Sequence, residues 1–208
     1  MIDTESDRGE KAPILIIACG ALAQDIVAVK ELNGWDHLHL TCLDAELHNR
    51  PELIAPRLRQ KIIQNRCLFE NIFVAYADCG SGGEIDKVLM EEGIDRLPGA
   101  HCYSFFAGEN KFFELAEEAL GTFYVTDFLL QHFERLVVKG LKLDRYPELR
   151  EQFFGNYTRL MYLSQCPTES LIQRAKDAAS TLGLTFDHYP CGYGGLQRGI
   201  ETQVIKFS

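Results

Sequence analysis

The sequence predicts an α/β fold with a mainly parallel, Rossmann-like sheet and helices on both faces. Short apolar runs alternate with segments of helical spacing, and such alternation is typical of parallel sheets. Two of the apolar runs are followed at once by a Cys-Gly pair and a helical segment, at Cys19-Gly20 and at Cys79-Gly80. A chain of 208 residues suffices for one such domain or for two small lobes around a cleft. We expect residues 13–208 to form a single α/β domain after a flexible, polar tail at 1–12.

The predicted strands are short, apolar and rich in β-branched residues. They cover residues 13–18, 38–43, 72–77 and 184–189, with an edge strand expected at 202–207. Residues 121–128 fit a strand or a loop entering a helix, and residues 157–163 fit a strand or a helix. The continuous apolar character of 13–18 and 72–77 is that of strands buried on both faces.

The predicted helices show apolar residues three and four positions apart. They follow the strands at 21–30, 54–65 and 84–92, and continue at 112–120, 128–138 and 147–154. The clearest helix spans 168–182 and is closed by Gly183, the residue type preferred just after a helix end.

Charge and hydropathy exclude some classes of function. The net charge of -9 argues against general binding to nucleic acid or to an anionic membrane, because both require basic patches. No apolar stretch approaches the length of a membrane span, and the polar N-terminal residues do not resemble a signal peptide. The sequence therefore predicts a cytoplasmic protein.

A glycine loop follows the apolar run at 72–77. Asp78 and Cys79 lead into Gly80, Ser81 and Gly82, and a helical segment comes next. In parallel sheets, loops at the carboxyl ends of strands form the ligand crevice, and free N–H groups at a helix start suit an anion. These residues are therefore predicted to bind a ligand, although the dinucleotide fingerprint GxGxxG is absent.

Four motifs together resemble a known family. They are the stretches at 16–22, 76–80, 101–108 and 121–129. In this order they resemble an uncharacterised prokaryotic family, the domain of unknown function 1638, over about residues 13–195. Members of that family often lie near genes for corrinoid-dependent methyltransferases in anaerobes. The resemblance implies a role in anaerobic one-carbon metabolism and methyltransferase proteins as partners, but it assigns no activity.

Three of the seven cysteines lie in these motifs, and they are the predicted metal ligands. Cys19 and Cys79 directly follow strands, and Cys102 follows a turn, so all three thiols can meet at one edge of the sheet. Three thiolates suit zinc or an iron–sulfur cluster. The alternatives are thiol chemistry without a metal, or small residues packed at tight strand ends. His101 is expected to support Cys102 rather than to bind the metal itself.

Other predicted ligand-binding residues have structural alternatives. Asp78 and Asp127 each precede a helix and can cap it instead. Tyr103 belongs to an aromatic set that forms either core or the wall of a pocket for a flat or methylated ligand. Arg159 can clamp a carboxylate or phosphate, or form an ion pair.

Three functions are compatible with these observations. The first is a metal- or iron–sulfur-dependent enzyme or accessory protein that acts on a small molecule. The second is a non-catalytic module that binds a small molecule or an anion. The third is a partner of a methyltransferase complex. The zinc or cluster is the feature that separates the first from the others.

Overall fold

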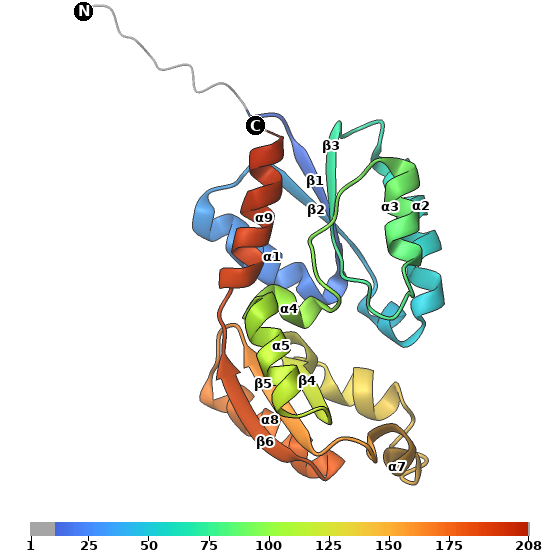
Figure 1. The fold of residues 1–208 in the computed structure, drawn as a ribbon, viewed down its shortest axis with the longest axis vertical. Helices are drawn as coiled ribbons and strands as arrows, with labels where there is room; N and C mark the ends of the chain where they lie inside the picture. Colours follow the sequence, from blue (N-terminus) through green and yellow to red (C-terminus); the bar gives the residue numbers. More distant parts are fainter. Residues whose placement is uncertain (1–10, 208) are drawn as a thin grey trace, which may run out of the picture.

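The fold is that of an α/β protein with two parallel sheets, as Figure 1 shows. The computed structural model describes residues 11–207, so most of the predicted N-terminal tail and Ser208 lie outside the described residues. The two sheets have three strands each, in the orders β2-β1-β3 and β4-β5-β6. This confirms the predicted Rossmann-like class, here built as two halves rather than as one continuous sheet.

The first half contains the strands that carry two of the predicted cysteines. Strand β1 (Ile14–Cys19) lies between β2 (Leu38–Leu43) and β3 (Asn71–Ala75). All six residues of β1 are buried, as expected for a central strand covered on both faces. The connecting helices are α1 (Ala23–Asn33), α2 (Ile54–Asn65) and α3 (Glu84–Glu92). The short 3-10 helices η1 (Gly20–Leu22), η2 (Ala45–Asn49) and η3 (Pro51–Leu53) fill the loops after β1 and β2.

The second half also has one strand between two parallel neighbours. Strand β5 (Arg159–Ser164) is central between β4 (Thr122–Thr126) and β6 (Thr185–Pro190). The structure therefore resolves 157–163 as mainly strand. Its helices are α5 (Glu109–Glu118), α6 (Asp127–Gln131), η4 (Glu134–Lys139), α7 (Leu149–Phe154) and α8 (Glu169–Leu182). Thr126 caps α6 and Thr168 caps α8, each accepting a backbone N–H.

The prediction of an edge strand at 202–207 was wrong. The segment belongs to helix α9 (Gly194–Lys206), which places Leu196, Ile200 and Val204 in the core of the first half. Their spacing of four residues is helical, but it began before the segment that the prediction considered. Helix α9 carries the chain back from the second sheet to the first, so the chain crosses between the two halves twice (Figure 1).

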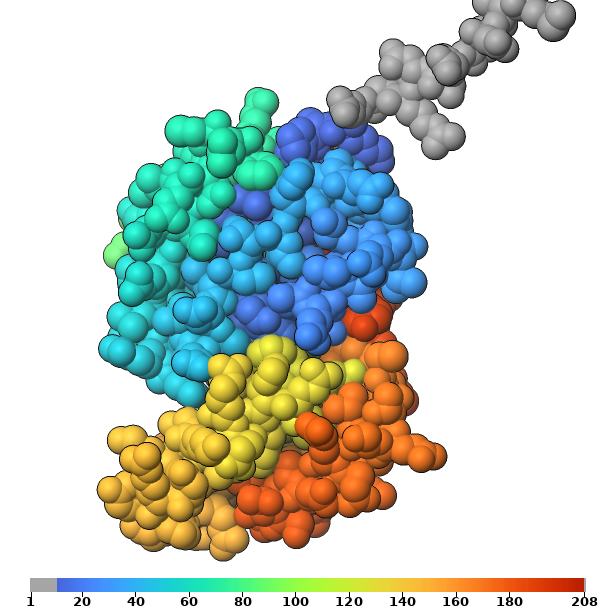
Figure 2. All heavy atoms as spheres, turned by 180° about the vertical axis from the view of Figure 1, so that it is seen from behind, coloured from blue at the N-terminus to red at the C-terminus, as the bar shows by residue number. Residues whose placement is uncertain are grey.

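The two halves touch along a seam. Figure 2 shows the segment around residues 125–145 lying directly against the N-terminal half. Arg135 on η4 forms an ion pair with Glu46 on η2 at 2.5 Å. Helix α6 also lies against η1. The carboxyl ends of β1 and β4 therefore approach each other across this seam.

Candidate functional site

The three predicted cysteines come together at the carboxyl edge of the first sheet. Cys19 is the last residue of β1, and Cys79 follows β3 by four residues. Beyond α3, Arg96 forms a parallel bridge with Val74, and Leu97 N donates to the Val74 carbonyl at 2.9 Å. This pairing lays the following loop beside the one after β3, and it delivers Cys102 to the Cys79 side of the sheet.

Cys79 and Cys102 form a close pair of sulfurs. Their Sγ atoms are 3.4 Å apart, which is the separation of a thiol hydrogen-bonded to a thiolate. Backbone contact holds the two loops together, because the Cys79 N–H donates to the Ala100 carbonyl at 3.4 Å. Cys79 has a left-handed backbone, with φ of 48°, which a side chain rarely adopts and which is typical of constrained functional positions.

His48, which the sequence analysis did not single out, interacts with this pair. His48 lies on η2, after the strand that borders β1 on the other side. A hydrogen bond with the Cys79 side chain and the charge of its thiolate raise the pKa of His48, against a smaller effect of burial. The available signal was position: His48 follows β2, so it lies at the same edge of a parallel sheet as Cys19.

The pair has one acidic proton and one tightly held proton. The thiol of Cys102, as hydrogen-bond donor, is the main cause that lowers the pKa of Cys79 to about 5; burial opposes the shift and His48 reinforces it. The same hydrogen bond, with burial and the Cys79 charge, raises the pKa of Cys102 well above its ordinary value. At neutral pH the pair therefore carries one negative charge, and that charge favours the protonated form of His48.

Cys19 behaves in the opposite way. Burial is the main cause that raises its pKa to about 11, and a backbone hydrogen bond from Ala21 compensates only in part. The fully buried Tyr76 lies against it, and burial followed by the neighbouring Cys19 raises the pKa of the Tyr76 hydroxyl. Cys19 is thus a neutral thiol beside the charged pair.

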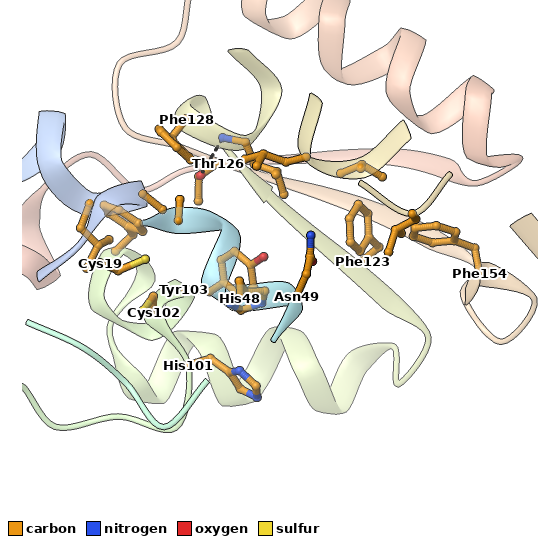
Figure 3. A pocket seen from close by; sticks show the side chains of 18 residues that line it. Cys19, His48, Asn49, His101, Cys102, Tyr103, Phe123, Thr126, Phe128 and Phe154 are labelled. Carbon is orange, nitrogen blue, oxygen red and sulfur yellow. Dashed lines mark hydrogen bonds between the residues drawn. The ribbon is translucent and has the colours of Figure 1, made fainter. Parts of the chain in front are cut away.

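An apolar pocket opens in front of the thiols. Its volume is about 170 Å³, and it lies between the two halves of the fold (Figure 3). Cys19, His48 and Cys102 line it from the first half, whereas Cys79 does not reach it. The rest of the wall is mainly aromatic and aliphatic, and it includes Tyr103, Phe106, Phe123, Phe128, Leu129 and Phe154. Among residues 11–207, no Asp, Glu, Lys or Arg lines this pocket.

The glycine loop does not offer the open anion site that its sequence predicted. The Asp78 carboxylate accepts hydrogen bonds from the Ser81 hydroxyl and from the N–H groups of Gly82 and Gly83, at 2.7, 3.3 and 2.8 Å. Burial opposes these bonds, but they hold the pKa of Asp78 below its ordinary value, together with the Gly80 N–H. A carboxylate of the chain itself therefore occupies the place expected for a ligand.

Asp127 also serves the fold. It lies at the carboxyl end of the second sheet, where its carboxylate accepts bonds from the Tyr162 hydroxyl at 2.7 Å and from Gln165 N and Cys166 N at 3.1 and 2.7 Å. These bonds tie the start of α6 to the loop after β5. Asp127 is 8% exposed as a residue, and it does not line the pocket.

The structure does not bring Arg159 to the site. It begins β5, at the opposite end of the strand from the pocket edge, and is buried. Its guanidinium donates to Thr122 Oγ1, to the Leu115 carbonyl and to the Asp187 carboxylate at 3.1–3.2 Å. These bonds satisfy the charge within the chain.

His101 and Tyr103 flank Cys102 on different sides of the pocket rim. Figure 3 shows the His101 ring pointing away from Cys102, and it lies near Phe112, with ring centroids 6.1 Å apart. Both His101 and Tyr103 line the pocket, and Tyr103 lies near Tyr124. His48, rather than His101, is therefore the imidazole of the thiol pair.

The arrangement of the side chains does not support the predicted metal site. Within residues 11–207, no group of three or more His, Cys, Asp or Glu side chains has an arrangement that could hold a metal ion. The cysteines outside the site motifs are Cys42, Cys67, Cys166 and Cys191, and all seven cysteines are free. Within the same described residues, every helix is too short or too polar to cross a bilayer.

Comparison with protein-family models identifies the family of the chain. The model described as "Protein of unknown function (DUF1638)" matches residues 42–200. The chain belongs to the DUF1638 family. The resemblance drawn from the four motifs is thereby confirmed, and the matched range contains His48, Cys79 and Cys102 but not the first motif at 16–22.

Other comparisons add little to the DUF1638 membership. No curated protein matches the chain. Among solved structures, it is similar to an ornithine carbamoyltransferase from Pyrococcus furiosus, with 12% identity and a TM-score of 0.26. The match covers 86% of this chain and 54% of the other, so the chain spans about half the length of that solved chain.

Proposed function

We propose that the Cys79–Cys102 pair is a thiolate centre that acts on a small molecule held in the apolar pocket. The observation that carries this proposal is the contact of three groups: two sulfurs 3.4 Å apart, with His48 interacting with the inner sulfur. A thiolate, not a thiol, is the nucleophile in cysteine chemistry. Burial alone would raise the pKa of these thiols, so the pair and the histidine together are what keep the charge there.

Each group has a distinct role in this proposal. Cys102 faces the pocket and meets the ligand, and Cys79 lies behind it and accepts the proton that Cys102 gives up. His48 lies at the rim, where it can protonate a leaving group. Because no carboxylate, lysine or arginine is found among the described residues that line the pocket, the thiolate is the dominant negative charge beside it.

The wall of the pocket supports an apolar or methyl-bearing ligand. Aromatic faces attract methylated cations, which would also be balanced by the thiolate. Such a ligand agrees with the one-carbon metabolism, and with the methyltransferase partners, that the family resemblance implies. We propose this ligand class as part of the same function.

A second candidate is the binding of a soft metal ion. Cys79, Cys102 and His48 are the donor types that zinc takes, and they already share one contact network. An iron–sulfur cluster would use thiolates in the same place, with Cys19 as a further donor. Either metal would require the third and fourth donors to move toward the pair.

Two measurements test the proposal. Brief alkylation by iodoacetamide at pH 6, followed by peptide mass spectrometry, should label the pair before Cys67 and Cys166. Those two thiols are exposed, whereas Cys102 is half-buried and Cys79 buried, so exposure alone predicts the reverse order. Labelling of the exposed cysteines first would refute the thiolate centre. Cys42→Ser serves as a control that leaves the pair intact.

Elemental analysis separates the second candidate from the first. Protein purified without oxygen should carry less than about one tenth of a zinc or iron per chain if the centre works as thiols alone. A stoichiometric metal that disappears in Cys79→Ser but stays in Cys42→Ser would establish the metal site instead, because serine oxygen is a poor ligand for a soft ion.

A further inference from the structure

We infer that Cys79 and Cys102 form a two-electron dithiol centre that reduces a small-molecule disulfide bound in the pocket. The inference rests on the proposed thiolate centre and names its substrate class. Its geometric basis is the order of the atoms: Cys102 lines the pocket, and the Cys79 sulfur lies 3.4 Å from it without reaching the pocket. A disulfide that enters the pocket would contact Cys102 first, and Cys79 would lie on the far side of the Cys102 sulfur.

The pair is close enough to close into a disulfide with small movements. A disulfide bond is about 2.05 Å long, so the sulfurs must approach by about 1.4 Å. Neither residue lies in the sheet: Cys79 is in the loop after β3, and Cys102 is the first residue of the short helix α4 (Cys102–Ala107). The N–H of Cys79 already donates to the carbonyl of Ala100 in the loop before that helix. Both cysteines are free in this structure, which is the reduced state that the reaction requires.

The reaction balances without another oxidant or reductant. The Cys79 thiolate takes the proton of Cys102, and the Cys102 sulfur attacks a disulfide RSSR and expels the first thiolate, which takes the proton of His48. Neutral His48 then removes the proton from Cys79. The Cys79 sulfur attacks the Cys102 sulfur, expels the second thiolate into the pocket, and His48 returns the proton to it. Two thiols RSH leave, and the protein keeps the Cys79–Cys102 disulfide.

The neighbouring groups favour this order of events. The Cys79 charge is one cause that keeps the Cys102 proton tightly held, so it is lost only when Cys79 accepts it. Attack from behind Cys102 also places the nucleophile opposite a leaving group in the pocket. Cys19 lines the same pocket, but burial raises its pKa to about 11. Cys102 can pass its proton to the Cys79 sulfur 3.4 Å away, and this transfer is what lets Cys102 rather than Cys19 attack as a thiolate.

The test uses the full-length protein and 2-hydroxyethyl disulfide at pH 7. The parent protein should lose two hydrogens in mass, release two equivalents of 2-mercaptoethanol, and yield a peptide linked through Cys79 and Cys102. Cys79→Ser should stop with a half-disulfide on Cys102, because the second attack is lost. Cys42→Ser should react like the parent. A melting curve for each variant confirms that it is folded.

Several outcomes would overturn the inference. A stable half-disulfide on the parent protein would show that Cys79 does not resolve it, and a linkage to Cys19 would assign the reaction to another pair. Bound metal that blocks the exchange would also exclude it. Alkylation with iodoacetamide is run in parallel: reaction of the pair at pH 6 without disulfide formation rejects this inference alone, whereas failure of both rejects the proposed function as well.

Discussion

The pH profile of thiol alkylation is the sharpest test of the site. The perturbation is Cys79→Ser, which leaves the pocket-facing Cys102 in place but removes the partner that stores the charge. In the parent protein the pair loses its first proton at about pH 5. In the variant, Cys102 is a lone, partly buried thiol whose pKa should be about 9 or higher, because burial disfavours the thiolate.

The size of the pKa difference between the parent pair and the variant decides at which pH the alkylation rates must be compared. At pH 7 the parent pair is almost fully ionised and the variant about 1% ionised, which alone predicts a hundredfold difference. The nucleophilicity of a thiolate falls with its pKa, however, with a Brønsted slope of about 0.45, so four pH units cost about 60-fold. The two effects nearly cancel at pH 7, and a rate comparison there has no diagnostic value.

The difference emerges in acid. At pH 5.5 the parent pair is still about three-quarters ionised, while the variant has about one thiolate in three thousand, which leaves the parent about 40-fold faster after the correction. The rate of the parent should be level above about pH 6, whereas that of the variant should rise about tenfold per pH unit up to about pH 9.

The assay is stopped-flow or quenched alkylation with iodoacetamide, with the modified peptide quantified by mass spectrometry. His48→Asn should move the midpoint of the parent profile upward, because it removes the cation that reinforces the Cys79 thiolate. Cys42→Ser should leave the profile unchanged. Identical profiles for the parent and Cys79→Ser would refute the reasoning, since the charge would then not reside on the pair.

Three further predictions concern the fold around the site. Burial, with the charge of Asp127, raises the pKa of Asp25 to about 7, so between about pH 4 and 7 the folded state binds a proton that the unfolded state has lost. The free energy of unfolding, measured by urea denaturation, should therefore fall by up to about 4 kcal/mol as the pH rises from about 4 to 7. This fall should be absent in Asp25→Asn. A Cβ on Gly195 would lie 2.2 Å from the Phe105 carbonyl oxygen, so Gly195→Ala should cost about 2 kcal/mol or more of stability by the same melts. Arg159→Met should lower stability by about 3 kcal/mol, because it leaves the Leu115 carbonyl unpaired, yet keep the alkylation profile; a changed profile would place Arg159 in the site after all.

Much of the fold could be predicted because local sequence patterns determine most of its elements. The continuous apolar run of β1 and the helical spacing of α8 specify their elements almost without tertiary context. The C-terminal segment failed because its apolar residues could fit either period over six positions. What decides in favour of helix α9 is the packing of Leu196, Ile200 and Val204 against the first half, a contact across the chain that no local pattern contains.

The candidate site was predicted in part for the same reason. Cys19 and Cys79 were placed correctly at one sheet edge, because residues after parallel strands share that edge. His48 was missed because it lies five residues beyond the end of β2, inside a 3-10 helix. The glycine loop was misleading because free N–H groups can be satisfied by a side chain next to them, and Asp78 does so.

Cys19 supplies the internal comparison that shows what the site adds. It lies at the same edge as Cys79, and the two thiols are about equally buried, 4% and 6% exposed. Yet burial leads in raising the pKa of Cys19 to about 11, while that of Cys79 is lowered to about 5. Exposure therefore does not distinguish the two thiols.

What distinguishes them is the set of groups that each sulfur meets. Cys19 has a phenol and a backbone N–H beside it, whereas Cys79 has a thiol donor and an imidazole that becomes a cation. If these two groups create the thiolate, then Cys79 in a His48→Asn, Cys102→Ser double variant should titrate like Cys19, and it should resist alkylation below about pH 9. Persistence of an acidic Cys79 in that variant would mean that the strained loop itself, rather than its neighbours, stabilises the charge.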